Sequence, residues 1–141
     1  MTNPLWDNPE RLQGTVLPTY ANRFDLGALE YPFRNIYSAG GVTTLLETGI
    51  TAAGTTIADA YDLTKALSVV TTTASGTGVQ LDDAKVGAQR EVKNLGANAL
   101  LVYPEAAGTV INALAAGAGF SIAAGGSATF RRVSAALWVT V

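Results

Sequence analysis

The sequence predicts an all-β protein: an antiparallel β-sandwich or barrel-like module at residues 39–141, preceded by an extended arm at residues 1–38. Apolar, β-branched segments of strand length recur along the module, and turn residues separate them at the roughly 8–12-residue spacing of such folds. Glycine-rich turns also punctuate the stretch 90–141. Residues 1–38, by contrast, hold four of the five prolines and six of the eleven aromatic residues.

The proposed arm combines residues that disfavour regular structure with residues that favour burial. Proline fixes φ and removes a backbone donor, which argues against a helix or a central strand. Aromatic rings at this density are too apolar for a free tail, so we expect them to be buried on a surface. A partner is favoured over the chain's own module, because Trp and Tyr are enriched among interface anchors. The candidate partner-binding residues are Trp6, Tyr20, Phe24, Tyr31, Phe33 and Tyr37.

Strands are predicted where β-branched and apolar residues cluster. The segments concerned are Phe33–Ser38, Val42–Leu46, Leu67–Thr73, Val79–Leu81, Ala99–Tyr103 and Leu137–Val141. Residues 56–67 contain helix formers, but glycines precede them and β-branched residues surround them. We expect a loop or an irregular edge segment there, with a single helical turn as the alternative.

A short tandem repeat, the Ala-Ala-Gly echo, predicts two hairpin arms. Residues 115–122 and 123–130 both begin with Ala-Ala-Gly and both end on a bulky apolar residue. Glycine supplies the positive φ that tight turns require.

Ala99–Tyr103 is apolar on both faces, whereas a surface strand of an antiparallel sheet should alternate apolar and polar residues. The strand is therefore expected either at the centre of a sandwich or against another subunit. The residues expected at a subunit interface are Leu101, Tyr103, Phe120, Phe130 and Trp138.

The composition argues against several kinds of functional site and partner. Only 14% of the residues are charged, and a weakly charged surface favours permanent assembly. The chain has no cysteine and no histidine, which removes thiolate metal sites and the usual proton shuttle. Its net charge of −2 and the lack of a basic stripe argue against a nucleic-acid partner. No apolar run approaches the roughly 18 residues of a membrane helix, and the N-terminus does not read as a signal peptide.

No catalytic motif is recognisable, so we expect neither an enzyme nor a bound cofactor or metal. Asp82 and Asp83 form the only adjacent acidic pair. A solvated turn is the favoured interpretation, and a hard-cation site made with backbone carbonyls is the alternative.

Two stretches carry a family resemblance. Residues 26–37, LGALEYPFRNIY, resemble a Leu-Gly…Phe/Trp-x-Asn-Ile/Val-Tyr signature of bacteriophage fibre and appendage proteins, where it marks a strand of an intertwined trimer. The segment 49–141 resembles a small all-β module of tailed-phage virion proteins. The matching segments include Asn94-Leu95-Gly96-Ala97-Asn98, Val102-Tyr103-Pro104, Ile111-Asn112 and, near the C-terminal end, Trp138.

The resemblance implies a non-enzymatic virion component that forms a homotrimer. One module joined to an aromatic arm favours a head decoration or cement protein on the capsid surface, with the major capsid protein or another virion protein as partner. The alternative is a short head or tail fibre that binds the host surface.

Overall fold

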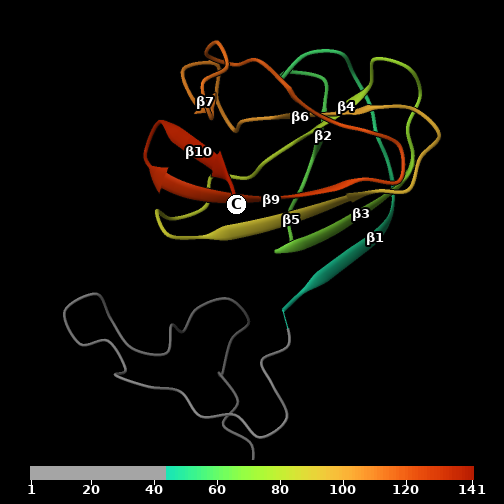
Figure 1. Cartoon of the computed structure of the whole chain (residues 1–141), viewed down its shortest axis with the longest axis horizontal. Helices are drawn as coiled ribbons and strands as arrows, with labels where there is room; N and C mark the ends of the chain where they lie inside the picture. The colour runs from blue at the N-terminus through green and yellow to red at the C-terminus, as the bar shows by residue number, and fades with distance from the viewer. Residues whose placement is uncertain (1–43) are drawn as a thin grey trace, which may run out of the picture. The chain divides into compact units, whose positions relative to one another are not determined.

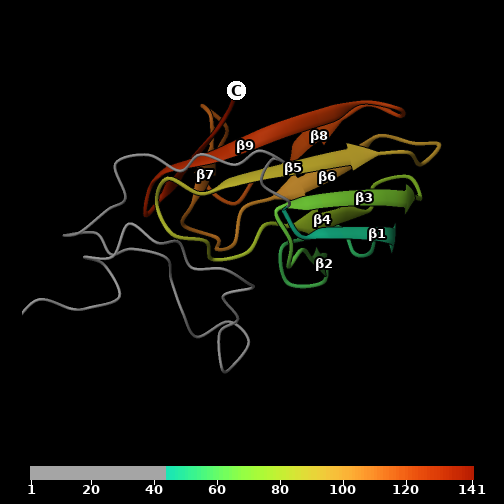
Figure 2. The ribbon, with the colours of Figure 1, turned by 90° about the horizontal axis from the view of Figure 1, so that it is seen from below.

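The computed structural model describes residues 44–141, which contain ten strands and no helix. The strands form two sheets, which face each other as two layers (Figures 1 and 2). Sheet A has, in spatial order, β1 (Leu46–Thr51), β3 (Leu67–Thr72), β5 (Gln89–Asn94), β9 (Ser127–Ser134), β10 (Leu137–Thr140) and β7 (Val110–Ile111). Sheet B has β2 (Tyr61–Asp62), β4 (Gly78–Gln80), β6 (Leu100–Tyr103) and β8 (Phe120–Ile122). The all-β prediction is confirmed for the described residues.

The chain winds between the sheets instead of folding back on itself. Strands β1 to β9 alternate between sheet A and sheet B, so β1, β3 and β5 pair in parallel, as do β2, β4 and β6. This is a β-solenoid-like arrangement of mixed sheets, and the prediction of an antiparallel sandwich or barrel is wrong. The turn spacing that led to it is the same whether a turn reverses the strand or carries the chain to the opposite layer.

The winding ends in antiparallel strands. In sheet A, β9 pairs antiparallel with both β5 and β10, and in sheet B, β8 pairs antiparallel with β6. The predicted hairpin of the Ala-Ala-Gly echo does not form, because its first copy ends in β8 and its second leads into β9 of the other sheet. The predicted turn glycines are confirmed: Gly117 and Gly125 have φ of 72° and 74°.

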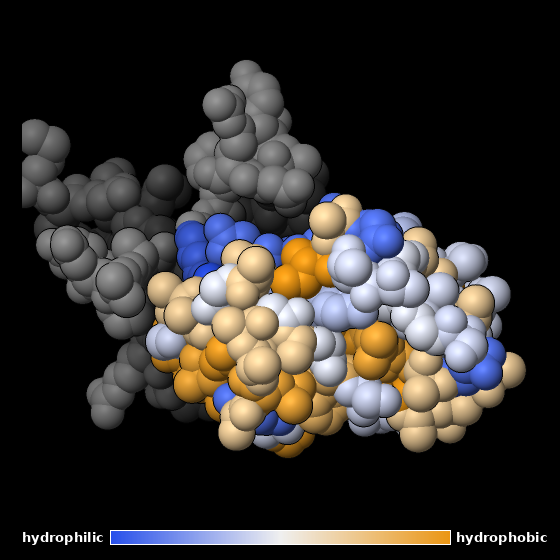
Figure 3. Space-filling model, turned by 90° about the horizontal axis from the view of Figure 1, so that it is seen from above, coloured by the Kyte–Doolittle hydropathy of each residue, from blue (hydrophilic) through white to orange (hydrophobic). Residues whose placement is uncertain are grey.

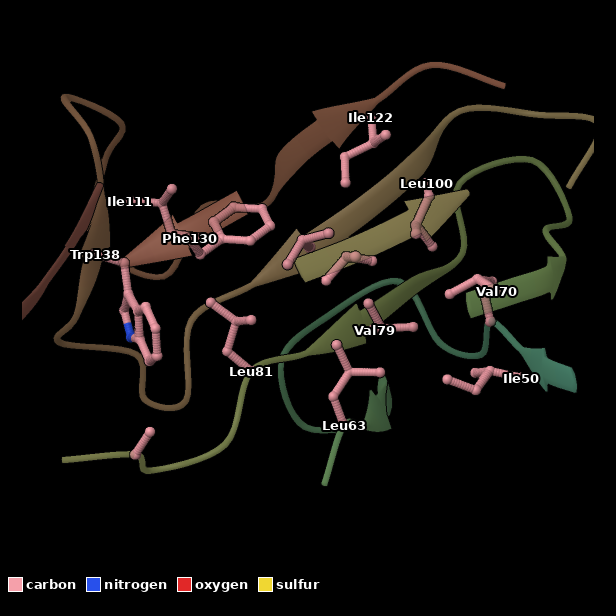
Figure 4. Close-up of a cluster of buried hydrophobic side chains, with 14 residues drawn as sticks. Ile50, Leu63, Val70, Val79, Leu81, Leu100, Ile111, Ile122, Phe130 and Trp138 are labelled. Atoms are coloured by element: carbon pink, nitrogen blue, oxygen red, sulfur yellow. The ribbon is translucent and has the colours of Figure 1, made fainter. Parts of the chain in front are cut away.

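The core fills the space between the two sheets (Figure 4). Inward positions follow the period-2 alternation of each strand, so Ile50, Val70 and Val92 are buried while the residues on either side of each are more exposed. The figure shows the core running from Ile50 and Val70 at one end to Trp138 at the other.

The predicted strands at Leu67–Thr73, Val79–Leu81, Ala99–Tyr103 and Leu137–Val141 are all present, each within a residue or two at its ends. Residues 56–67 contain turns and the two-residue edge strand β2, as the irregular-edge interpretation predicts. Asp59 closes this loop by accepting hydrogen bonds from the Thr56 amide and hydroxyl, which lower the pKa of its carboxyl.

The arm, its six aromatic residues, the predicted strand Phe33–Ser38 and the start of Val42–Leu46 lie outside the described residues. Among residues 44–141 there is no helix with the length and apolar character needed to cross a membrane.

Candidate interaction surfaces

Three of the five predicted interface residues are buried within a single chain. Phe130 and Trp138 are fully buried in the core (Figure 4), and Tyr103 is 6% exposed. Leu101 and Phe120 are only partly buried. Large apolar residues in a short chain signal burial, but the pattern alone does not distinguish a core from a subunit interface. Of the five, Leu101 and Phe120 therefore have surface to offer a partner.

Tyr103 shows how the second apolar face of β6 is covered. Its ring lies against Gly78 and Gly119, where an added Cβ would come within 2.6 Å and 3.0 Å of ring atoms. Its hydroxyl donates a hydrogen bond of 2.7 Å to the Thr55 carbonyl. Burial, and then the charge of Asp59, raise the pKa of this phenol. The loop between β1 and β2 thus packs on sheet B and covers this face of β6. Contact with another subunit was one of the two expectations for the same face.

Asp82 and Asp83 do not form a shared cation site. Asp82 binds Arg90 through two hydrogen bonds of 2.7 and 2.6 Å, and Asp83 binds Arg132 at 2.6 Å. Among residues 44–141, no group of three or more acidic side chains is placed to hold a metal ion. Each carboxylate instead forms an ion pair with a different arginine.

A buried polar cluster surrounds Arg132, and sequence reasoning did not predict it. Glu105 accepts hydrogen bonds from Trp138 Nε1 at 2.7 Å and from Thr109 Oγ1 at 3.1 Å, and it forms an ion pair of 2.8 Å with Arg132. The Glu105 and Arg132 side chains are only 8% and 7% exposed. The one local signal is that Arg132 occupies an inward position of β9, two residues after Phe130. With its carboxylate already accepting these three donors, the cluster serves to join strands.

The β1 edge of sheet A is the first candidate surface. Leu45 and Leu46 are 66% and 53% exposed at the point where residues 1–43 join the module. The Leu45 carbonyl accepts from Leu67 N–H of β3, so the backbone groups of the next residue, Leu46, point away from β3. This edge therefore offers both backbone hydrogen-bonding groups and apolar side chains to a partner.

Glu47 and Tyr61 connect the first strands of the two sheets. The Tyr61 hydroxyl donates a 2.5 Å hydrogen bond to Glu47 Oε1, and Thr64 Oγ1 donates to Oε2 at 3.3 Å. The bond to Glu47 raises the pKa of Tyr61 above its ordinary value of 10.0.

We therefore predict that Tyr61 titrates above pH 10.0 in the folded protein. The hydrogen bond stabilises the neutral phenol, so its contribution to stability is complete below pH 10.0 and is lost as the pH rises through the raised pKa. An ultraviolet difference titration of wild type against Tyr61→Phe isolates this group. Glu47→Ala should return the pKa towards 10.0, and an unchanged titration would contradict the assignment.

A groove at the opposite end of the winding is the second candidate surface. It has a volume of about 390 Å³ and lies between β8, the beginning of β9 and the end of β10. Its lining carries no charged side chain and consists of Phe120, Ser121, Ile122, Ala123, Gly126, Ser127, Ala128, Thr129, Thr140 and Val141. Hydroxyl groups and a partly buried aromatic ring suit a neutral partner.

The face of the described residues shown in Figure 3 has the same weakly charged character. It is mainly pale or orange, with separate blue patches. A search for similar proteins finds no matching family, no similar curated protein and no similar solved structure.

Proposed function

We propose that this protein is a virion structural protein that decorates the head of a bacteriophage. The N-terminal arm would bind the capsid, and the β-module would assemble as a homotrimer on the outside of the shell. The observation that carries the proposal is the β1 edge, where Leu45 and Leu46 are exposed a few residues after the aromatic, proline-rich segment ends. The sequence resemblance to virion proteins supports the same assignment.

The weakly charged surface fits a protein that acts by adhesion. Burial of apolar area contributes about 25 cal/mol per Å², so the rings of one arm would supply modest affinity. Three arms held in one trimer would bind the repetitive shell together, and the effective concentration of the second and third arm would raise the overall affinity. The protein would then stabilise the shell by bridging neighbouring capsid subunits.

The direct test is attachment of purified protein to empty heads of the phage that encodes it. Full-length protein should coat the heads, and a variant that begins at Ser38 should lose at least 90% of the bound material. A matched variant, with Trp6, Tyr20 and Phe24 each replaced by alanine, should lose affinity while keeping residues 1–37. Co-sedimentation with the heads measures both.

Full coating by the truncated variant would refute binding through the arm. Density for the protein on the tail of the intact particle, with none on the head, would favour the alternative of a short fibre that binds the host surface.

A further inference from the structure

The groove beside β8 lies where sheet B stops and sheet A continues. β8 is the last strand of sheet B, whereas β9 is followed in sheet A by β10 and β7. In Figure 2, β8 lies behind β9 near this end of the sheets. β10 ends at Thr140, opposite Phe130, and beyond it the Val141 amide still donates to the Thr129 carbonyl. The first residues of β9 and the outer edge of β8 therefore border the same groove.

The backbone of Ser121 points out of this edge. Leu101 N–H donates to the Thr77 carbonyl, so the backbone of Leu101 faces β4. Ser121 is the antiparallel partner of Leu101 in β8. Opposite residues of an antiparallel pair either both face each other or both face away, so the N–H and C=O of Ser121 point away from β6. An added strand would find one donor and one acceptor there.

We propose that residues Phe33–Ser38 of a second copy bind in this groove as an additional strand beside β8. This inference rests on the proposed homotrimer, in which each copy would give its segment to the next. Period-2 alternation puts Phe33 and Tyr37 on one face of the segment, and their rings suit the neutral groove beside Phe120. Addition of an extended peptide to a sheet edge is an established mode of recognition.

The length of the chain permits the exchange. Seven residues, 39–45, separate Ser38 from β1, and an extended segment of this length spans about 25 Å. That distance is enough to leave one module and reach an adjacent one. A donated segment in a head-to-tail ring closes after three copies and leaves no copy without a partner. Residues 1–32 would remain to bind the capsid.

Disulfide trapping tests the proposal well, because the chain contains no cysteine. Ser121→Cys would be combined in one chain with a single cysteine at each position from 33 to 38 in turn. At one or two adjacent or alternate positions, mild oxidation should link most of the chains into covalent dimers and trimers on a non-reducing gel. The matched control is Ser75→Cys, in an exposed turn outside the groove lining, which should give at least tenfold less product with the same six positions.

Each other outcome has a defined meaning. Disulfides formed only within one chain would overturn exchange and show that the segment covers its own module. A protein that sediments as a trimer, but gives no product at any of the six positions, would overturn the groove while leaving the trimer intact. A wild-type monomer in sedimentation would refute both the trimer and the exchange, and attachment to heads would then have to be explained by single copies.

A second variant checks the edge without cysteine chemistry. Ser121→Pro removes the outward N–H but no hydrogen bond to β6, so the module should fold, as shown by an unchanged circular dichroism spectrum. The trimer should dissociate at concentrations at least tenfold higher than for wild type. A folded Ser121→Pro variant with unchanged trimer affinity would contradict strand addition at β8.

Discussion

Replacing Glu105 by alanine should lower the free energy of unfolding by about 3–5 kcal/mol, the range for removing one partner of a buried ion pair. The carboxylate accepts from Arg132, Trp138 and Thr109, and its side chain is 8% exposed. Its removal leaves the Trp138 indole N–H without this acceptor and the Arg132 guanidinium, which lies 5.8 Å from the Trp138 ring, without its buried counter-charge.

Arg132 keeps other acceptors in this variant, which limits the loss. Its Nη1 still binds Asp83 and the Ala84 carbonyl, and its Nη2 still binds the Ala135 carbonyl. Asp83 is 86% exposed, so it compensates less than a buried carboxylate would. Glu105→Gln, which preserves shape and one acceptor, should cost less than Glu105→Ala.

Urea unfolding followed by tryptophan fluorescence measures these differences. The matched control is Glu91→Ala on the exposed face of β5, where we expect a change within about 0.5 kcal/mol. If Glu105→Ala were as stable as Glu91→Ala, the cluster would contribute nothing to the joining of β9, β10 and the loop after β6.

The cluster around Arg132 could not be predicted from the sequence, although the strands that carry it could. Strand positions follow from local composition, and alternation marks Val70 and Phe130 as buried, although it does not separate a core from a subunit interface. The pairing of the strands cannot be assigned from the sequence, because β-branched strands separated by glycine turns are compatible with both an antiparallel sandwich and a solenoid-like fold. The contact of Glu105 with Arg132 joins residues far apart in the chain, and it becomes visible only when the loop after β6 is placed against β9.

The two candidate surfaces also differ in how far they could be predicted from the sequence. The exposed Leu45 and Leu46 could have been found as apolar residues near the arm, but the groove depends on which strand ends sheet B. Phe120 was among the residues predicted at a subunit interface. The structure leaves it partly buried, with its ring 5.5 Å from that of Phe130 in a perpendicular arrangement.

Asn94 holds the other end of the sheet A strands, away from the Arg132 cluster. Its Oδ1 accepts from Thr73 Oγ1 and from the Gly96 amide, both at 3.0 Å. Its Nδ2 lies 2.9, 3.1 and 3.2 Å from the carbonyl oxygens of Asn98, Ile122 and Ala123. Since Asn94 lies in β5 and Ile122 in β8, this fully buried side chain joins the two sheets.

Asn94→Asp should therefore destabilise the protein by more than about 3 kcal/mol at pH 7, because it places a buried carboxylate oxygen against carbonyl oxygens. Burial and these carbonyls would raise the carboxyl pKa in the folded state above the unfolded value of about 3.9. The protonated form is then the favoured one in the fold, so the loss relative to wild type should be smallest near pH 4. It should grow as the pH rises through the raised pKa.

Denaturant unfolding of both proteins at a series of pH values provides the measurement, with the difference taken at each pH. Gln89→Glu is the matched amide-to-acid control, since Gln89 is exposed and its side-chain oxygen accepts from Arg131. A new charge there should change stability by less than about 0.5 kcal/mol and show no comparable increase above pH 4. An Asn94→Asp loss that stayed constant between pH 4 and pH 7 would mean that the carboxylate remains solvated, and that Asn94 does not join the sheets through the three carbonyls.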